Sequence, residues 1–415
     1  MPTGSKSSVG SSPETLADQP DKTVLVDDLC AWLIDQALSE PELETLFIGC
    51  NRRIHATGIP LTRAMIGYST LHPLYRSKTL NWSHQGNVEN IPRTFDDQNT
   101  TDWKTSPLRH MIDNGITLLR RRLCGSDALL DFPILEGLRD QGFTDYLAYT
   151  VPFTDGYSDA DDAQGLVGSW ATDSVNGFSD AHLRSLIRIQ KRLAVAMKVR
   201  IKDEIANNVL SAYLGADAGG RVLQGRIRLG DGELLHAVIW YSDMRNSTRL
   251  AGELPHADFL VLLNNYFHCT AGAVLAEGGE VLRFVGDAVL AIFPLGDDFT
   301  ARDAGKRAVR AIREASRRRK SLAEDGIHVN FGIGLHYGDL LYGNIGVPER
   351  IEFSVIGPCA NEVARLEDLT KELGYPVLLS AELASLIDDE SLVSMGEHSV
   401  RGVDKPMSVF RLSEE

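Results

Sequence analysis

Two aspartates in the C-terminal half of the chain stand where a divalent metal site is expected. Asp243 follows the apolar run HAVIWYS, which predicts a strand, and Asp287 lies at the tip of a hairpin predicted in RFVGDAVLAIF. If the two strands are neighbours, both carboxylates meet at one end of a sheet, where Mg²⁺ is typically held by carboxylates and substrate phosphates. Two such ions can activate a hydroxyl nucleophile and neutralise a leaving pyrophosphate. Taken singly, each aspartate is an ordinary turn residue.

The segment that follows the first aspartate, Met244–Thr248, predicts the start of a helix. Free backbone N–H groups and the positive end of the helix dipole form a natural cradle for phosphate beside the metals. A plain N-cap by Asn246, Ser247 or Thr248 is the simpler interpretation, and the two are compatible.

Asn361 and Arg365 lie four residues apart in GPCANEVARLED and therefore share one face of a predicted helix. An asparagine and an arginine that project together can orient a ribose and stabilise charge developing on a phosphoryl group. By spacing alone, a solvated helix face is the alternative.

The elements that position these residues are predicted within residues 233–415. They are a strand at His236–Tyr241, a helix at His256–Glu277, a hairpin of Glu280–Val285 and Ala288–Phe293, a helix at Thr300–Ala323, strands at His328–His336 and Ile351–Ile356, and a helix at Cys359–Leu373. This β-α-β-β-α-β order predicts an α+β, ferredoxin-like domain: a mostly antiparallel sheet with helices on one face.

Four segments, in this order and spacing, resemble the catalytic domain of class III adenylate and guanylate cyclases: WYSDMRNST, GGEVLRFVGDAVLAIF, LHYGDLLYGNIG and FSVIGPCANEVARLE. The resemblance implies an adenylate cyclase that converts ATP to 3′,5′-cyclic AMP and pyrophosphate with two Mg²⁺ or Mn²⁺ ions per site. It also implies a homodimer with shared active sites, in which the metal-binding residues of one subunit meet the Asn/Arg pair of the other.

The resemblance assigns roles to individual residues. Asp243 and Asp287 match the two metal-binding aspartates, and the Met244 carbonyl is a further metal ligand. Arg401, in SVRGVDKP, falls where the family places a basic residue against the phosphates. The helix start adds further substrate-binding candidates, namely Met244, Arg245, Asn246, Ser247 and Thr248.

The remaining roles concern the ribose, the transition state and the base. Asn361 matches the ribose-orienting asparagine, and Arg365 matches the arginine that stabilises the pentavalent transition state. Arg283 stands where adenylate cyclases carry an adenine-reading lysine, and Ser354 is the second base-reading position. Arginine can donate to adenine N1 but also pairs with the O6/N7 edge of guanine. Because guanylate cyclases are expected to carry an acidic residue at 283, ATP is preferred. The alternatives are a guanylate cyclase or a catalytically weak, cyclase-like nucleotide-binding regulatory module.

The N-terminal half predicts a disordered tail (1–22), a sensor domain (23–178) and a connecting helix with a linker (179–232). The expected helices are Asp27–Ala37, Pro41–Ala56 and Leu108–Leu123; the expected strands are Leu61–Ser69, Tyr146–Phe153 and Gly165–Thr172; and Thr79–Thr105 is expected to be a long loop. The run LLDFPILEGLRDQGFTDYLAYTVPF resembles an α/β GAF-like sensor, which implies control by an unknown small molecule or protein. Ser179 is a candidate N-cap for a connecting helix that reaches about Leu214.

Composition limits the partners. The formal net charge of −15 argues against nucleic acid, and it requires local positive charge for a polyanionic substrate. Five scattered cysteines without a CxxC pair favour a reduced, cytoplasmic setting. No apolar run near 20 residues or signal peptide is apparent, so no membrane span is predicted.

Overall fold

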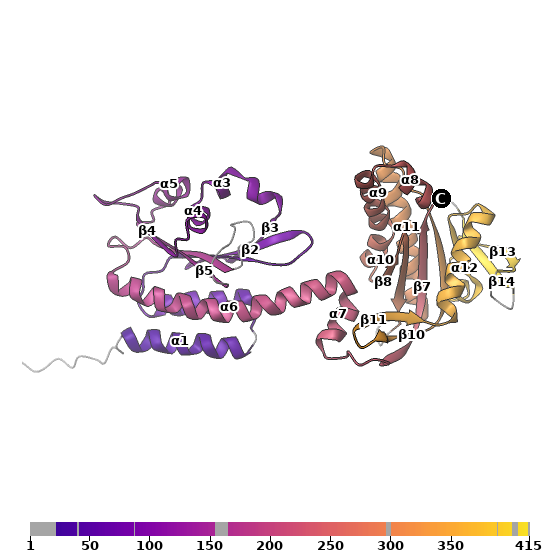
Figure 1. The fold of residues 1–415 in the computed structure, drawn as a ribbon, viewed down its shortest axis with the longest axis horizontal. Coiled ribbons are helices and arrows are strands. Elements are labelled where there is room, and N and C mark those ends of the chain that lie inside the picture. The colour runs from indigo at the N-terminus through magenta and orange to yellow at the C-terminus, as the bar shows by residue number, and fades with distance from the viewer. Residues whose placement is uncertain are drawn as a thin grey trace, which may run out of the picture. The chain divides into compact units, whose positions relative to one another are not determined.

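The computed structural model describes residues 22–39, 41–86, 88–153, 165–295, 300–387, 389–400 and 406–413. The chain divides into two compact units, Met1–Asn208 and Val209–Glu415, and the division falls inside the long helix α6 (Asp180–Leu214). Each unit has its own sheet and core (Figure 1). The predicted tail lies outside the described residues except for Lys22, where the first helix begins.

The N-terminal unit is built on a six-stranded sheet with the order β3-β2-β1-β6-β5-β4, in which all neighbouring strands are antiparallel. Its strands are β1 (Arg63–Ser69), β2 (Tyr75–Ser83), β3 (Val88–Thr94), β4 (Leu118–Arg122), β5 (Asp145–Pro152) and β6 (Gly165–Thr172). Buried side chains point alternately to the two faces of the sheet, so other elements must pack on each face to shield its apolar side chains from water.

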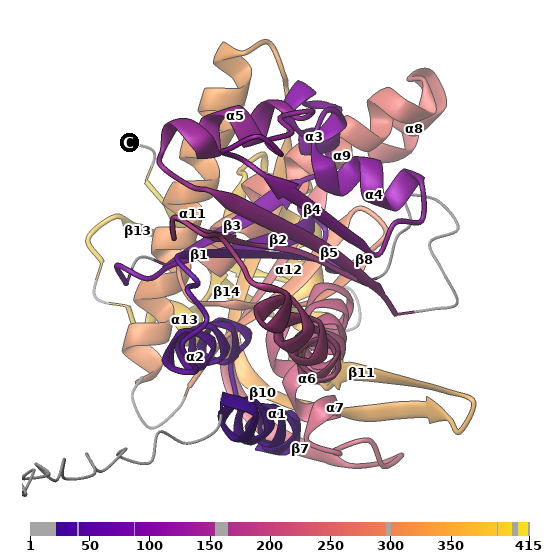
Figure 2. The same ribbon diagram turned by 90° about the vertical axis from the view of Figure 1, so that its left-hand side faces the viewer.

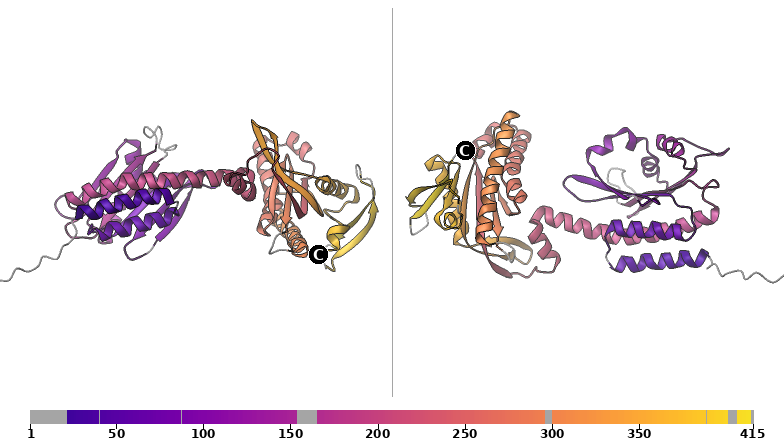
Figure 3. Two further views of the ribbon diagram at one scale, coloured as in Figure 1. Left: turned by 90° about the horizontal axis from the view of Figure 1, so that it is seen from below. Right: turned by 180° about the vertical axis from the view of Figure 1, so that it is seen from behind.

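Helices cover both faces of this sheet. The helices α1 (Lys22–Ser39) and α2 (Leu43–Ala56) and the first part of α6 pack on one face and run side by side (Figures 2 and 3). The other face carries α4 and α5 over a second apolar cluster. The short elements on that side are the 3₁₀ helix η1 (Asp96–Asn99), α3 (Thr101–Lys104), α4 (Pro107–Asp113) and α5 (Pro133–Asp140).

Two expectations for this unit were wrong. The predicted loop at Thr79–Thr105 contains most of β2 and all of β3, which form a polar hairpin at the sheet edge with little apolar alternation to reveal it. The predicted helix at Leu108–Leu123 is a short helix, α4, followed by the strand β4. The chain turns at Gly115, whose φ of +64° lies in the left-handed region and interrupts the helix.

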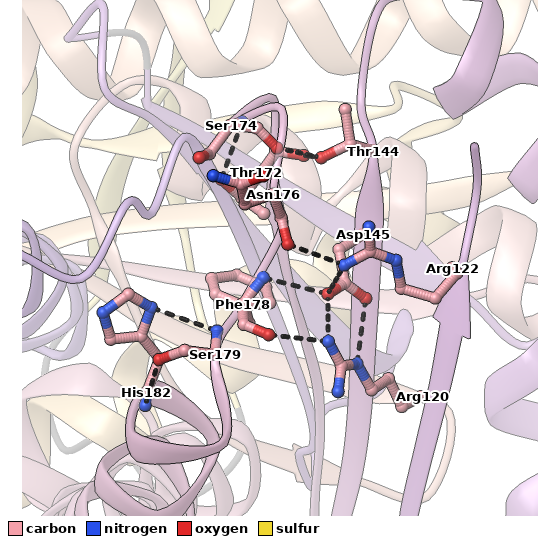
Figure 4. A network of polar contacts seen from close by, with 10 residues as sticks. All are labelled: Arg120, Arg122, Thr144, Asp145, Thr172, Ser174, Asn176, Phe178, Ser179 and His182. Carbon is pink, nitrogen blue, oxygen red and sulfur yellow. Dashed lines mark hydrogen bonds and ion pairs between the residues drawn. The ribbon is translucent and has the colours of Figure 1, made fainter. Parts of the chain in front are cut away.

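A buried carboxylate fixes the connection from β6 into α6 (Figure 4). Asp145 is fully buried and accepts hydrogen bonds from Arg120 Nη2 at 2.7 Å and from the Phe178 backbone N–H at 2.9 Å. Arg122 Nη1 donates to the Asn176 carbonyl at 2.8 Å. Because an unpaired buried charge is costly, these contacts hold the segment before α6 against β4 and β5.

The helix α6 begins as predicted. The Ser179 hydroxyl accepts from the His182 backbone N–H at 3.2 Å, which is the geometry of an N-cap. The helix is 35 residues long, and Ile201 is its last buried residue. The short helix α7 (Ala216–Leu223) then lies inside the segment predicted to be a linker.

The C-terminal unit is built on a sheet with the order β13-β14-β12-β10-β7-β9-β8, and β11 pairs with β10. Of the described pairs, β10 with β12 is parallel and the others are antiparallel. Its strands are β7 (Gly232–Met244), β8 (Glu280–Val285), β9 (Ala288–Pro294), β10 (Phe331–Val347), β11 (Arg350–Ile356), β12 (Val377–Ser380), β13 (Leu392–His398) and β14 (Met407–Leu412).

Helices lie on both faces of this sheet, so the expectation of helices on one face was wrong. Val238 and Trp240 of β7 are buried in the cluster formed with α9, α10 and α11, whereas Ala237 and Ile239 pack with Val363 of α12. Figure 1 shows α12 on the opposite side of β7 from α9 and α11. The helices are α8 (Ser247–Glu253), α9 (His256–Cys269), α10 (Ala271–Ala276), α11 (Ala301–Glu324), α12 (Pro358–Leu373) and α13 (Ala381–Ala384).

Strand β10 is much longer than the predicted strand, which ended at His336. It continues to Val347 and pairs over its second half with β11, from Leu341 opposite Ile356 to Val347 opposite Arg350. This two-stranded arm extends beyond the rest of the sheet (Figure 2). Its glycines resemble turn residues in the sequence, which explains the missed extension.

One segment, His256–Ala276, has the length and apolar composition of a membrane-spanning helix, with a mean hydropathy of 1.4. Polar residues interrupt its apolar run, so the sequence pattern does not reveal it. In the structure it forms α9 and α10, and Tyr266, Cys269 and Val274 are buried in the core of the unit. A core helix passes the same test, so the segment is weak evidence of a membrane span.

Candidate functional site

The pairing of β7 with β9 brings the two predicted metal-binding aspartates together. Asp243 is opposite Ala288 in the register, so Asp287 is at the same end of the neighbouring strand. The Met244 backbone N–H donates to the Asp287 carbonyl at 3.3 Å. Burial raises the pKa of Asp243; a hydrogen bond from Lys371 opposes this rise, and the nearby Asp287 carboxylate adds to it. A cation bound here would therefore stabilise a carboxylate that is partly withdrawn from water.

Lys371 is a member of the site that sequence reasoning missed. Its ammonium lies 3.0 Å from Asp243 Oδ2, 3.2 Å from Asp368 Oδ1 and 3.4 Å from Glu367 Oε2. Burial lowers the pKa of Lys371, but the hydrogen bond to Asp243 and the charge of Glu367 outweigh that effect and raise it. Its position in the sequence relates it to Glu367 and Asp368, four and three residues earlier on α12, and gives no sign of Asp243.

The predicted phosphate cradle lies beside Asp243. Asn246 has φ +59°, the one positive φ among the described non-glycine residues, and it precedes α8 as its N-cap. No described side chain caps the first N–H groups of α8. Non-glycine residues in the left-handed region cost free energy and tend to occur at functional sites. The turn thus places uncapped backbone donors next to the two carboxylates.

Asp243 and the turn that follows it line an open cavity of about 880 Å³, whereas Asp287 is not part of the wall of this cavity. All six residues of the predicted run DMRNST contribute to its wall, from Asp243 to Thr248. The cavity wall also includes three cationic side chains that the sequence did not single out, Arg249, Arg319 and Lys371. Positive charge is therefore concentrated around this cavity, as a polyanionic ligand of an acidic protein requires.

Arg245 lines the cavity, but its polar groups are engaged within the unit. Its guanidinium donates to Glu367 Oε1 at 2.7 Å and also bonds Thr370 Oγ1, and its backbone N–H donates to the Asn330 carbonyl at 2.8 Å. Glu367 is almost fully buried. The observed contacts make Arg245 a support beneath the site, and its predicted contact with substrate would require them to break.

Asn361 and Arg365 are exposed on α12, as their shared spacing predicts, and Arg365 Nη1 lies 3.3 Å from Asp368 Oδ2. Asn361 precedes Lys371 by ten residues, or about 15 Å along the helix axis. Neither Asn361 nor Arg365 lines the cavity at Asp243. Within one chain, the predicted metal site and the predicted Asn/Arg pair are therefore separate.

The two predicted base-reading residues contact each other. Arg283 Nη1 donates to Ser354 Oγ at 3.3 Å, and Ser354 is buried. Arg283 Nη2 also forms an ion pair with Glu352, which sequence reasoning missed. Glu352 and Ser354 are two residues apart on β11 and thus project to the same side of the strand. Arg401, the predicted phosphate contact, lies outside the described residues.

No profile of a known protein family matches the chain. Among curated proteins, it is similar to the uncharacterized proteins Rv1318c (32% identity over 212 residues) and Rv1320c (30% over 234 residues) of Mycobacterium tuberculosis. The matches cover 50% and 55% of this chain. They cover 38% and 40% of those proteins, so the chain spans about two fifths of the length of the curated relatives it matches.

Solved structures that are similar to this chain include those of several cyclases. A bacterial light-regulated adenylyl cyclase matches with 28% identity over 43% of this chain and 91% of its own, at a TM-score of 0.38. The adenylyl cyclase CyaB from P. aeruginosa matches with 26% identity over 45% and 97%, also at 0.38. The guanylyl cyclase Cya2 matches with 24% identity over 44% and 93%, again at 0.38.

Replacing Lys371 with methionine should tighten divalent metal binding. The ammonium and a metal ion compete for the Asp243 carboxylate, and a half-exposed ion pair of this kind is worth about 1 kcal/mol, or about fivefold in affinity. Mn²⁺ binding to the full chain without nucleotide, followed by electron paramagnetic resonance, measures the effect. Lys320→Met, on the exposed side of α11, is the matched control. Unchanged or weaker Mn²⁺ binding in Lys371→Met would show that the lysine organises the carboxylate instead of competing for it.

Proposed function

We propose that the C-terminal unit is a class III nucleotide cyclase domain and that it acts as an adenylate cyclase, a phosphorus-oxygen lyase. The observation that carries the proposal is the pair Asp243 and Asp287 at one end of adjacent strands, beside the uncapped start of α8. The order of the four cyclase-like segments in the sequence supports it independently.

The donor atoms at this site suit a hard divalent cation. The carboxylates of Asp243 and Asp287 and the backbone carbonyl of Met244 are all oxygen ligands, which Mg²⁺ and Mn²⁺ prefer. We therefore assign two Mg²⁺ or Mn²⁺ ions per site to these three residues. Ions held there would favour ionisation of the attacking hydroxyl and would neutralise charge on the leaving pyrophosphate.

The residues of the chain supply binding and orientation. The ribose 3′-oxygen attacks the α-phosphorus of ATP and its hydroxyl proton passes to solvent; the new P–O bond forms as the bond to pyrophosphate breaks. The N–H groups at the start of α8, with Arg401 as a further candidate, bind the phosphates. Asn361 orients the ribose, and Arg365 stabilises the charge that develops on the α-phosphoryl oxygens.

These roles require two copies of the chain. About 15 Å of helix separates Asn361 from the part of α12 that reaches Asp243, and the Asn/Arg pair is directed to solvent. A two-fold dimer in which α12 of one subunit faces Asp243 and Asp287 of the other would complete two equivalent sites. This geometry supports a homodimer with shared active sites.

The contact between Arg283 and Glu352 bears on the base. A guanidinium donor beside a carboxylate acceptor matches the N1 acceptor and the N6 donor of adenine. Glu352 thus supplies the charged acceptor that Ser354 lacks, which supports ATP. The same two groups also match O6 and N1–H of guanine, so GTP is the second candidate substrate.

We further propose that the N-terminal unit is a GAF-like sensor that regulates the cyclase through α6, in response to an unknown small molecule or protein. The first half of α6 belongs to the core of the N-terminal unit, and its last residues lead into the C-terminal unit. The network around Asp145 sets the position at which this helix begins. The free thiols of the chain support a reducing, cytoplasmic setting.

Complementation between two inactive variants tests the cyclase and its shared site together. Asp287→Ala and Arg365→Ala should each abolish cyclic nucleotide formation from ATP with Mn²⁺, measured by chromatography. Co-expressed, they should recover about a quarter of wild-type activity, because half of the dimers are mixed and each has one intact site of two.

The matched control is co-expression of Asp287→Ala with Asp243→Ala, which removes ligands from the same half of every site and should stay inactive. Activity in either single variant, or a silent Asp287→Ala and Arg365→Ala mixture, contradicts the shared two-carboxylate site. A wild-type chain without product from ATP or GTP would favour a nucleotide-binding regulatory module.

Removing the base-reading acceptor should weaken turnover of ATP. Glu352→Ala is expected to lower kcat/KM for ATP by about tenfold, because the N6 amino group loses a charged hydrogen-bond partner. Steady-state rates with ATP and GTP measure it, with the exposed Glu349→Ala as control. If the rate with ATP is unchanged and the rate with GTP falls, Glu352 reads guanine and the chain is a guanylate cyclase.

Coupling through α6 is tested with two matched glycine variants. A Cβ at Gly177 would lie 2.3 Å from Arg122 Nη1 and 2.7 Å from Asp145 Oδ2, whereas one at Gly142 would meet nothing within 4 Å. Both glycines have positive φ, so both substitutions carry the same kind of backbone strain. Gly177→Ala should change the cyclase rate of the full chain at least about fivefold, the lower end of common allosteric couplings. Equal rates in the two variants would remove the basis for the coupling.

A further inference from the structure

A second cluster of metal-ligating side chains lies outside the cavity at Asp243. It joins His336 in the middle of β10 to Cys359 and Glu362 in the first turns of α12. His336 Nε2 is 3.1 Å from Glu362 Oε2, and the potential ligand atoms of all three residues lie within 4.8 Å of one another. His336 is 95% buried, so its imidazole is aimed into the interface between strand and helix.

The backbone of β10 lets the Cys359 side chain approach His336 closely. A Cβ at position 338 would lie 2.4 Å from Cys359 Sγ and 3.1 Å from His336 Nε2, so only glycine leaves room for the thiol against the strand. Pro358 starts α12 and favours its first-turn conformation. The thiol, the carboxylate and the imidazole are therefore positioned by backbone packing and not by exposed, freely rotating side chains.

The other ring nitrogen of His336, Nδ1, also has polar partners. His336 Nδ1 lies 2.9 Å from Ser380 Oγ, and Ser380 is fully buried. Glu382 Oε2 lies 3.8 Å from the same nitrogen. A polar partner on one ring nitrogen orients the other nitrogen toward its ligand, which is the common arrangement around metal-binding histidines.

We propose that His336 Nε2, Cys359 Sγ and Glu362 bind one Zn²⁺ or a similar borderline-soft divalent cation. Nitrogen, thiolate and carboxylate ligands together suit Zn²⁺, whereas the oxygen ligands at Asp243 and Asp287 suit Mg²⁺. Ligand atoms around a tetrahedral Zn²⁺ lie about 3.3–3.8 Å apart, so small side-chain rotations would complete the site. Binding converts the Cys359 thiol to a thiolate and releases its proton to solvent.

The position of the cluster gives the cation a structural role. Cys359 and Glu362 flank Asn361 in the sequence, so a cation held with His336 ties the start of α12 to β10. That bond would fix the orientation of Asn361. This consequence for catalysis rests on the proposed cyclase function, whereas the binding site itself does not.

Cobalt binding to the full chain tests the proposal. Co²⁺ takes the place of Zn²⁺ and gives a thiolate charge-transfer band in the near ultraviolet when it is bound by cysteine. The chelator-treated protein is titrated without nucleotide and in excess Mg²⁺, which occupies the oxygen-ligand site. We expect one equivalent of Co²⁺ per chain with this band, and loss of the band when Zn²⁺ is added.

Variants assign the band to the cluster. Cys359→Ser should remove the charge-transfer band, and Glu362→Gln should weaken Co²⁺ binding at least about tenfold. Cys269→Ser removes a buried thiol elsewhere in the same unit and should leave the band unchanged. Far-ultraviolet circular dichroism of the metal-free variants verifies folding. No band in the wild-type chain, or a band that persists in Cys359→Ser, overturns the proposal, and neither result depends on cyclase activity.

Discussion

The register of β7 between β9 and β10 determines the candidate site. On β9, the residue opposite Asp243 is Ala288, which directly follows Asp287. On β10, the residue opposite Asp243 is Gly332. If the pairing of β7 slipped by one residue, Asp243 would point to the opposite face of the sheet. The apolar side chains that now face α9–α11 would face α12, and those that now face α12 would face α9–α11. Because both faces of β7 are buried, under α9–α11 and under α12, such a slip would expose apolar side chains on each side. Core packing thus holds the two carboxylates at the same sheet end.

Charge beneath the site is balanced by a short chain of ion pairs. Glu367 is almost fully buried and is met by Arg245 from the start of the α8 segment and by Lys371 from its own helix. Lys371 in turn contacts Asp243. A Cβ on Gly332 would lie 2.5 Å from Glu367 Oε1, so glycine is needed on β10 to make room for this network. Since a buried carboxylate without a partner is costly, the network couples the position of α12 to the position of the strand end.

The sequence predicted what depends on local periodicity and spacing. The strand before Asp243, the hairpin around Asp287 and the helix that carries Asn361 are all present, and the residues of the turn Asp243–Thr248 line one cavity. It failed where distant contacts decide the structure. Three successive arginines at 120–122 form a strand because two of them, Arg120 and Arg122, form ion pairs with Asp145 of the neighbouring strand. Lys371, Glu352 and His336 each contact residues far away in the chain, which spacing does not reveal.

Helix α12 carries residues of three proposed functional groups on different parts of its surface. Its first turns bring Cys359 and Glu362 against β10, its exposed face presents Asn361 and Arg365, and its last turns bring Lys371 to Asp243 at the end of β7. A rigid helix transmits a shift at one end to the other, because its backbone hydrogen bonds preserve the rise per residue. Any change that moves the start of α12 along β10 therefore alters both the Asn/Arg face offered to a second chain and the ammonium at Asp243. The two halves of the proposed active site are thus mechanically joined through one element before any substrate binds.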